Sequence, residues 1–411
     1  MSKDDPNRKR VQKFYNQRPY PPPVKDLDDY GLRWQDAGRR RADFHLPWPH
    51  QPYREDLTIL VAGCGTSQAA KHALRNPNAS VVGIDLSPTS IQHTQELKRK
   101  YRLDNLEVHQ LPVEQVGELG QRFDKIICTG VLHHLPDPDE GLRALRDVLA
   151  LEGALHLMVY AAYGRQGVYM LQEYARLLGV GDTDAEITDF AKALMELPQD
   201  HPLAPLLGAS PDFRTKAGLA DALLNPQDRA YTVPQLFEWI AGAGLTFGRW
   251  LRQAPYLPQC GAFAETPHAS RLTTLPEPEQ FAAMELLRGT MLRHSLIVYR
   301  EDAPTIAGIA FDGVGWLDYV PIRLPETICV EEKLPPGAVG VLINQNHTDK
   351  DIYLPINEAE KRMFEAIDGF LSIAEIIQKV PVDQQLACSF FNSLWGYDQV
   401  VFDTSKSSQY R

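Results

Sequence analysis

The sequence predicts an α/β protein whose main domain is a doubly wound, seven-stranded and mainly parallel sheet. Short, continuously apolar runs begin at Leu57 and alternate with stretches of helical period up to Tyr160, in the order β-α-β-α-β-β-α-β. Strands that are apolar throughout bury both faces, as they do in a parallel sheet that helices cover on each side. The alternation returns between residues 233 and 300, where two further strands would complete the sheet.

Length and composition limit the protein class. The 411 residues allow two or three domains, and 44% hydrophobic with 23% charged residues is ordinary for a globular protein. A formal net charge of −11 repels a phosphate backbone, so we expect no nucleic-acid partner. Five scattered cysteines fit neither a disulfide framework nor a four-ligand zinc site, so we expect a reducing compartment and no metal. The apolar runs are far shorter than the roughly 20 residues that span a bilayer, which predicts a cytoplasmic protein without membrane contact.

The pattern changes three times along the chain. Residues 1–54 are Pro-rich and poor in apolar residues, so we expect an arm. Residues 55–302 hold the alternating strands and helices, and helical patterns broken by prolines at 161–230 predict an insertion that caps the sheet. Residues 303–411 combine short strands with helices from Glu358 onward, which predicts a small α+β, winged-helix-like accessory domain.

A glycine-rich turn follows the first strand. Gly63, Cys64 and Gly65 lie where that strand ends and the first helix begins, a place where backbone N–H groups can approach a ligand. Asp85 follows at the end of the second strand, where a carboxylate can accept hydrogen bonds from both hydroxyls of a ribose. Each feature alone could equally be a packing turn or a helix cap. Together they predict a nucleoside site.

Further motifs extend this site. AGCGT at 62–66, GIDLS at 83–87 and GVLHHLPDP at 130–138 make residues 57–300 similar to the class I S-adenosylmethionine-dependent methyltransferases. The Arg-Pro-Tyr-Pro segment at 18–21 resembles one that bacterial members carry near their N-terminus. The resemblance implies a Rossmann-like fold, methyl transfer, and S-adenosylmethionine as cofactor. With only two glycines, the turn fits this cofactor better than a dinucleotide.

The resemblance also implies which residues meet the cofactor. The implied residues are Gly63, Cys64, Gly65, Asp85, Leu86, Leu111, Val113, Thr129 and Gly130. Asp85 would bind the ribose, and Thr129 with Gly130 would lie near the amino-acid part. Cys64 fits a packing role. The chain departs from the pattern at Pro112, where the superfamily often has an aspartate on adenine, so adenine would rely on backbone near Leu111 and Val113.

The acceptor side carries fewer signals. A sulfonium methyl is already activated, so the protein must chiefly hold the reacting atoms in line and exclude water. His134 is the candidate general base, although the resemblance implies that it mostly shapes the loop. Three tyrosines after the fifth strand could contact the sulfonium or wall the acceptor, or simply be buried in the cap: Tyr160, Tyr163 and Tyr169. Arg165 could bind a substrate carboxylate or lie solvated in a loop.

The arm has two interpretations. Tyr15, Arg18 and Tyr20 combine aromatic area with a cation among stiff prolines, which suits a lid over cofactor and substrate. A terminal arm packed on the sheet would show the same residues.

Three functions follow from these patterns. The leading hypothesis is a bacterial methyltransferase that acts on a small molecule enclosed by the arm and the insertion. The second is a peptide or protein methyltransferase that docks its substrate through residues 303–411 by strand addition. The third is a cofactor-binding interaction protein without chemistry.

Overall fold

The computed structural model describes residues 6–209, 211–304 and 308–407. The chain divides into two compact units. The first comprises Met1–Gly31, Asp56–Leu245 and Gly289–Ser295; the second comprises Leu32–Glu55, Thr246–Arg288 and Leu296–Arg411. This division does not follow the predicted boundary at residue 302, and independent folding of 303–411 stays a prediction.

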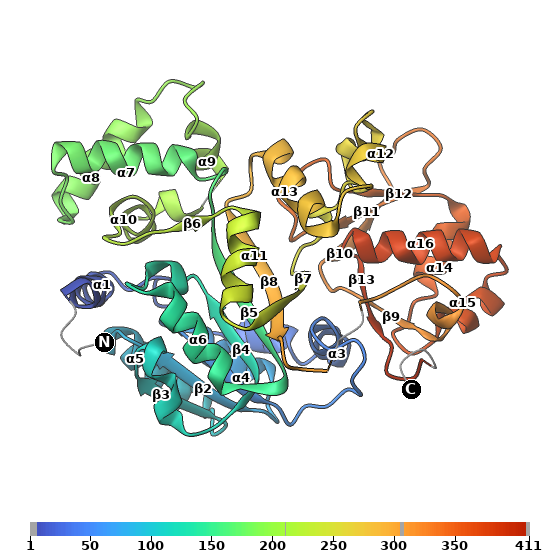
Figure 1. Ribbon diagram of the computed structural model, residues 1–411, viewed down its shortest axis with the longest axis horizontal. Helices are drawn as coiled ribbons and strands as arrows, with labels where there is room; N and C mark the ends of the chain where they lie inside the picture. Colours follow the sequence, from blue (N-terminus) through green and yellow to red (C-terminus); the bar gives the residue numbers. More distant parts are fainter. Residues whose placement is uncertain (1–5, 210, 305–307, 408–411) are drawn as a thin grey trace. The chain divides into compact units, whose positions relative to one another are not determined.

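Parallel strands at the centre of the first unit carry the site (Figure 1). The main sheet has the order β3-β2-β1-β4-β5-β8-β7, and the short β6 pairs with β5. Its strands are β1 (Thr58–Ala62), β2 (Ser80–Asp85), β3 (Leu106–Gln110), β4 (Phe123–Thr129), β5 (Leu149–Ala161), β6 (Ala230–Tyr231), β7 (Leu245–Trp250) and β8 (Arg293–Arg300). The α/β prediction is confirmed, with eight strands in place of seven because β6 forms a short eighth strand.

Register places the ends of the central strands at one edge. Val61 in β1 aligns with Gly83 in β2 and with Ile127 in β4, so the residues that follow these strands emerge side by side. Fully buried Ile59 and Leu60 anchor β1 in the core. The sheet therefore presents the glycine turn, Asp85 and the loop after β4 together.

Helices with sequence-encoded caps flank these strands. Ser87 accepts from the Ser90 N–H at the start of α5, and Pro88 occupies the first turn, where its missing N–H costs nothing. Asp137 caps α6 in the same way, through the N–H groups of Asp139 and Glu140. The helices are α4 (Gln68–Arg75), α5 (Pro88–Tyr101), α6 (Pro138–Val148) and α11 (Val233–Gly242), with 3-10 turns η1 (Val113–Leu119) and η2 (Leu132–His134).

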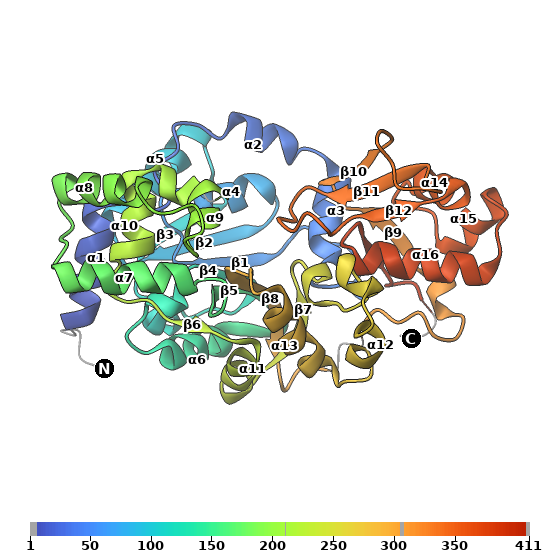
Figure 2. The ribbon, with the colours of Figure 1, turned by 90° about the horizontal axis from the view of Figure 1, so that it is seen from above.

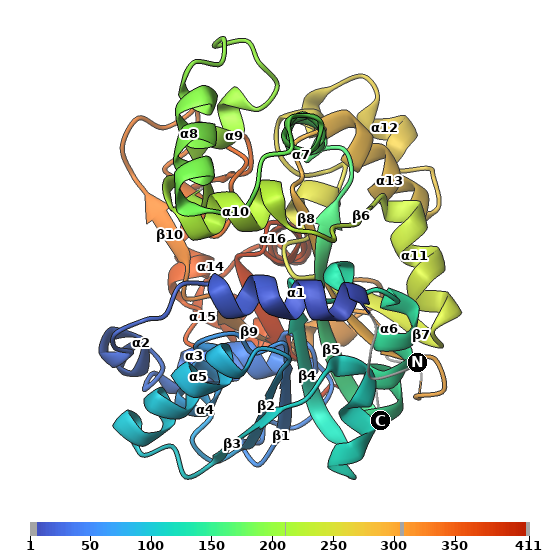
Figure 3. The same ribbon diagram turned by 90° about the vertical axis from the view of Figure 1, so that its left-hand side faces the viewer.

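A helical cap forms the rest of the first unit. It comprises α7 (Gln166–Leu178), α8 (Asp184–Met195), α9 (Ala204–Ala209), η3 (Pro211–Arg214) and α10 (Lys216–Leu224). Phe14 of α1 (Pro6–Gln17) joins its apolar core beside Val168, Ile187 and Leu219. From above, α7, α8 and α10 gather around α1 (Figure 2), and a side view places α1 between the strand ends and these helices (Figure 3).

The second unit contains two small antiparallel sheets, β10-β11-β12 and β13-β9. Trp316, Tyr319, Phe390 and Phe391 lie in its apolar core. Its elements are α3 (Ala37–His45), η4 (Ala254–Tyr256), η5 (Ala262–Glu265), α12 (Ala269–Leu272), α13 (Glu277–Arg288), η6 (Gly315–Asp318), β9 (Val320–Arg323), β10 (Thr327–Val330), β11 (Gly340–Asn344), β12 (Leu354–Ile356), α14 (Glu358–Glu365), α15 (Ile373–Lys379), α16 (Gln384–Gly396) and β13 (Val400–Asp403), while α2 (Asp28–Arg33) begins in the first unit. A small α+β C-terminal region is present, and its winged-helix character stays a prediction.

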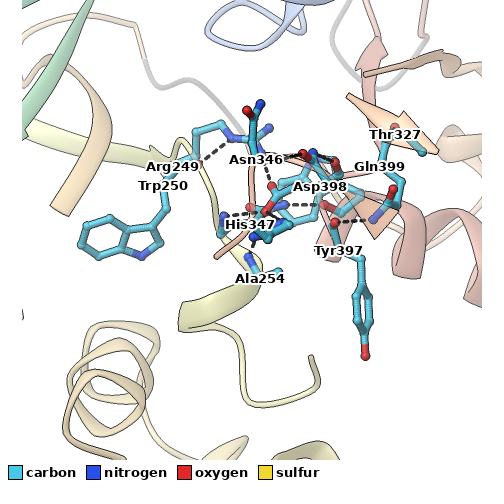
Figure 4. Close-up of polar contacts among 12 residues, drawn as sticks. Arg249, Trp250, Ala254, Thr327, Asn346, His347, Tyr397, Asp398 and Gln399 are labelled. Atoms are coloured by element: carbon cyan, nitrogen blue, oxygen red, sulfur yellow. Dashed lines mark hydrogen bonds and ion pairs between the residues drawn. The ribbon is translucent and has the colours of Figure 1, made fainter. Parts of the chain in front are cut away.

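A buried polar network centred on Asp398 organises the second unit (Figure 4). Arg249 Nη2 lies 3.3 Å from Asp398 Oδ1, and His347 Nε2 lies 3.3 Å from Oδ2. The backbone N–H groups of Gln253 and Ala254 donate to Oδ2 at 2.9 and 3.1 Å. Three donors thus bond to one carboxylate, with the His347 ring beside it, and three segments of this unit meet there.

Across the described ranges, no helix combines the length and the apolar content that crossing a membrane requires.

Candidate active site

The glycine turn has the backbone that its sequence predicts. Gly63 and Gly65 have φ values of 68° and 53°, a left-handed conformation that glycine adopts without a Cβ penalty. A Cβ on Gly63 would lie 2.3 Å from Val131 Cγ2, so the loop after β4 packs directly on the turn. The Gly65 N–H donates to Asp85 Oδ2 at 2.8 Å. The predicted residues of three strand ends therefore meet here.

Asp85 is a buried carboxylate held by backbone donors. Its Oδ1 accepts from the Ser87 N–H at 2.8 Å, while its Oδ2 accepts from Gly65. Burial raises the pKa of Asp85, and these N–H groups act in the opposite direction. Each oxygen retains a further lone pair that a ribose hydroxyl could use. Burial and the Asp85 charge raise the pKa of the neighbouring Cys64 thiol, which agrees with a packing role for Cys64.

The other predicted cofactor residues line the same edge. The Leu111 N–H donates to the Asp85 carbonyl at 3.1 Å, and the buried Val113 opens η1. Thr129 is the last residue of β4, and Gly130 follows it with φ 76°. The structure thus brings these residues together, and their cofactor contacts stay predictions.

The arm covers the glycine turn. If Gly65 had a Cβ, it would lie 3.4 Å from Pro21 Cδ and 3.5 Å from the Tyr20 carbonyl oxygen. The Thr66 hydroxyl donates to the Pro21 carbonyl at 2.9 Å. Tyr20 and Pro21 are therefore positioned over the turn, which both interpretations of the arm allow.

Helix α1 also contacts the loop after β2. Gln12 Nε2 donates to the carbonyl of Leu86, a predicted cofactor residue, at 3.0 Å. The Ser87 hydroxyl donates to Asn16 Oδ1 at 2.8 Å. These bonds fix α1 against the strand edge that Asp85 terminates.

The same helix reaches the cap. The Tyr15 hydroxyl donates to Asp221 Oδ1 at 3.0 Å and accepts from Asn225 Nδ2 at 3.1 Å. Arg18 Nη1 pairs with Asp184 Oδ1 at 2.8 Å. Burial and the Asp221 charge raise the pKa of Tyr15 well above its ordinary value, so Tyr15 remains a neutral phenol. The arm thus connects the turn to the cap.

His134 lies buried beside Tyr15, with ring centroids 6.3 Å apart. Its Nδ1 lies 2.6 Å from the Gln227 carbonyl oxygen, and the Gln227 side chain donates to the Leu135 carbonyl at 2.7 Å. A neutral imidazole in this position donates from Nδ1 and keeps its lone pair on Nε2. This is the tautomer that a general base at Nε2 requires.

His133 is a second buried imidazole in the same loop. Its ring centroid lies 3.9 Å from that of Tyr160 and 4.2 Å from that of His134. Burial lowers the pKa of His133 well below its ordinary value, so the ring is neutral. Neither ring nitrogen has a hydrogen-bond partner among the described residues.

Arg165 packs at the base of the cap. Its guanidinium carbon lies 3.5 Å from the Tyr160 ring centroid, and Nη2 lies 3.2 Å from Asp228 Oδ2. Gln172 Nε2 donates to the same oxygen at 3.0 Å. The solvated-loop interpretation of Arg165 is therefore wrong, because Asp228 pairs with it in a buried position. Tyr160 already stacks on this cation and on His133.

The remaining two tyrosines border this cluster differently. Tyr169 lies on α7, with its ring centroid 5.7 Å from the Arg165 guanidinium carbon, and burial raises its pKa to about 12. Tyr163 lies in the turn before α7, where its carbonyl accepts from the Gln166 N–H at 3.3 Å. Of the two, Tyr169 belongs to the cluster around Arg165.

Sequence reasoning missed several polar residues of the cap. They are Gln172, Asp221, Asn225, Gln227 and Asp228. One signal was available, because Asp221 interrupts the otherwise apolar run of α10 and is almost fully buried. A buried carboxylate requires a partner, here Tyr15.

Comparisons with known proteins agree with this geometry. A family model described as a methyltransferase domain matches residues 60–155. The chain is 30% identical over 309 residues to an uncharacterized protein of Synechococcus sp., syc1184_c, and the match covers 72% of each protein. It is also 32% identical over 158 residues to the tRNA U34 carboxymethyltransferase of Shewanella loihica, covering 38% of this chain and 47% of that protein.

The chain is also similar to solved structures. PKMT2 from Rickettsia typhi is similar with a TM-score of 0.64 at 16% identity, covering 90% of this chain and 75% of that one. The same protein in complex with AdoHcy gives a TM-score of 0.61. At this level of identity the likeness concerns the fold.

Proposed function

Because this chain belongs to the class I S-adenosylmethionine-dependent methyltransferases, we propose that it methylates a small molecule held beneath the arm and the helical cap. It is an enzyme, and S-adenosylmethionine is its cofactor, so the non-catalytic alternative is set aside. The observation that supports an enclosed acceptor most strongly is Tyr15, which the arm places between His134 and Asp221.

The residues at the strand edge suit this cofactor. The glycine turn offers backbone without Cβ atoms, and the Asp85 carboxylate has lone pairs for two ribose hydroxyls. Gly130 and the loop after β4 would flank the amino-acid part. When bound, the cofactor supplies an electrophilic methyl group, and the chain must position the acceptor and exclude water.

His134 is the residue we propose for proton removal from the acceptor. The Gln227 carbonyl fixes its Nδ1–H, so Nε2 can accept a proton from an O–H or N–H group as the methyl group transfers. Gln227 is in turn anchored to Leu135 and acts as a positioning residue. A mobile imidazole would lose this orientation.

A peptide acceptor is the second candidate. Strand β10 pairs only with β11 among the described strands, so its other edge is open for strand addition. Ile328 and Cys329 on this strand are exposed. This edge would bind polypeptide outside the enclosed site.

The test is methyl transfer from labelled S-adenosylmethionine to a lysate of the source organism, fractionated by size. Label in small molecules is expected, and label confined to polypeptide would favour the second candidate. His134→Gln should lower transfer about 10²- to 10⁴-fold without changing cofactor binding. The matched control is His93→Gln, on the outer face of α5, which should transfer at the wild-type rate. Equal activity of both variants would remove His134 as a base.

A further inference from the structure

Buried polar atoms around Arg165 lack partners among the residues that the structure describes. They are Asp228 Oδ1, Arg165 Nε and both His133 ring nitrogens. The Arg165 and Asp228 side chains are 9% and 4% exposed, so bulk water does not readily supply the missing hydrogen bonds. Unpaired buried polar groups are rare in native proteins and call for an explanation.

The Arg165–Asp228 pair is only half formed. A bidentate arginine–carboxylate pair uses two parallel N–H···O bonds. Here Arg165 Nη2 reaches Asp228 Oδ2 at 3.2 Å, while Nε and Oδ1 take no partner. Gln172 also donates to Oδ2 at 3.0 Å, so the carboxylate is fixed by contacts on one oxygen. One donor, Arg165 Nε, and one acceptor, Asp228 Oδ1, therefore remain without a partner in the same ion pair.

Charge balance limits what could bind there. Arg165 and Asp228 neutralise each other, so a charged ligand group would be buried without a counter-charge. The buried Asp221 carboxylate interacts electrostatically with Tyr160 and so adds negative charge to this region. An anionic group is therefore the least favourable of the alternatives.

We propose that the Arg165–Asp228 pair binds an uncharged group of the acceptor that carries adjacent hydrogen-bond donor and acceptor atoms, as an amide or lactam does. Its N–H donates to Asp228 Oδ1, and its carbonyl oxygen accepts from Arg165 Nε. Tyr169 provides ring surface beside it. This inference rests on the proposed function, because it assumes that the acceptor lies beneath the cap.

Three small probes of similar shape test the charge preference: benzamide, benzoate and benzylammonium. Their binding to the full chain saturated with S-adenosylhomocysteine is measured by titration calorimetry or ligand-observed NMR. Benzamide should bind the wild type at least about tenfold more tightly than either charged probe. Failure of benzamide to bind, or equal or tighter binding of benzoate, would overturn the proposal.

Two variants should change which probe binds most tightly, one in favour of the anion and the other in favour of the cation. Asp228→Asn frees the Arg165 charge, so benzoate should gain at least about tenfold and overtake benzamide. Arg165→Gln leaves Asp228 uncompensated, so benzylammonium should gain instead. Asp189→Asn removes an exposed carboxylate on α8 and should leave all three affinities unchanged. An unchanged preference in whichever variant retains binding of S-adenosylhomocysteine would refute the assignment.

The lysate experiment separates this inference from the proposed function. Transfer to a charged small molecule would preserve the proposed function and overturn the recognition assigned to Arg165 and Asp228. Transfer confined to polypeptide would overturn the proposed function, whereas the probe affinities would still report whether the pair prefers an uncharged group.

Discussion

The two compact units each bury an arginine–aspartate pair with nearly the same geometry. Nη2 and the carboxylate oxygen are 3.2 Å apart for Arg165–Asp228 and 3.3 Å apart for Arg249–Asp398. In the second unit, Asp398 accepts on both oxygens, and Arg249 Nε donates to the Trp250 carbonyl. In the first unit, Asp228 Oδ1 and Arg165 Nε have no partner in the described ranges.

This difference separates two uses of the same chemistry. A carboxylate that accepts on both oxygens holds its elements in one arrangement, because each donor would lose its partner on opening. A half-satisfied pair keeps part of its hydrogen-bonding capacity for another molecule. The two pairs therefore differ in how many of their atoms are satisfied, whereas their distances and burial are nearly the same.

The largest expected effect is on stability and separates the two aspartates. Asp398→Ala leaves Arg249 buried without its partner and removes the acceptor for two backbone N–H groups, so we expect a loss of about 3–5 kcal/mol in unfolding free energy. Asp228→Ala removes fewer hydrogen bonds and should cost at least about 1 kcal/mol less. Urea unfolding measures both.

The control for this pair is Asp312→Ala, an exposed position in the second unit that should change stability by less than about 0.5 kcal/mol. Equal losses for Asp398→Ala and Asp228→Ala would show that the number of satisfied donors does not distinguish the pairs.

Asp85 sharpens the comparison, because each of its oxygens accepts one protein N–H and keeps a lone pair for a ligand. Asp85→Ala should weaken binding of S-adenosylmethionine about ten- to hundredfold, equivalent to about 1.5–3 kcal/mol, since two ribose hydroxyls lose a charged acceptor. Titration calorimetry measures it, with the exposed Asp104→Ala as control. Wild-type affinity in the Asp85 variant would remove the ribose assignment.

Acid should affect the first unit more than the second. Among the described residues, burial lowers the pKa of His72, His133 and His156 in the first unit and that of His45 in the second. The pKa of His72 falls to about 3, from burial first and the Lys125 charge second. Between that value and an unfolded value of about 6.5, the unfolded chain binds a proton that the folded chain does not. Stability is therefore lost as the pH falls below about 6.5.

For His72 alone this linkage amounts to about 2 kcal/mol between pH 7 and pH 5. His72→Leu should reduce the pH dependence of the unfolding free energy by about that amount over this interval. Between pH 7 and pH 8 the unfolding free energies of the wild type and the variant should change in parallel, because His72 is neutral in both the folded and the unfolded chain. Urea unfolding at pH 5, 7 and 8 measures these free energies. The same dependence of unfolding free energy on pH in both proteins below pH 7 would contradict a buried neutral His72.

The sequence predicted which residues meet at this edge of the sheet because its signals are local. Apolar runs define the strands, and a turn that needs left-handed backbone requires residues such as Gly63 and Gly65 at fixed places along the chain. Asp85 follows from its position at a strand end. Each of these residues can be placed without knowing what lies elsewhere in the chain.

The contacts beneath the helical cap could not be predicted from the sequence, because they join distant segments. Tyr15 meets Asp221 across 206 residues of sequence, and Arg165 meets Asp228 across 63. No hydrophobic periodicity distinguishes Gln227 or Asp228 from the residues of an ordinary polar loop. The two interpretations of the arm differ only in such contacts, so the residues of the arm alone could not decide between them.

The contacts of the arm have a kinetic consequence. One continuous segment rests on the glycine turn through Pro21 and is tied to the cap through Tyr15 and Arg18. We expect this segment to withdraw as one piece and to uncover both regions together. We therefore expect departure of the spent cofactor and admission of the next acceptor to share one gate, so that the turnover rate depends on how often the arm detaches.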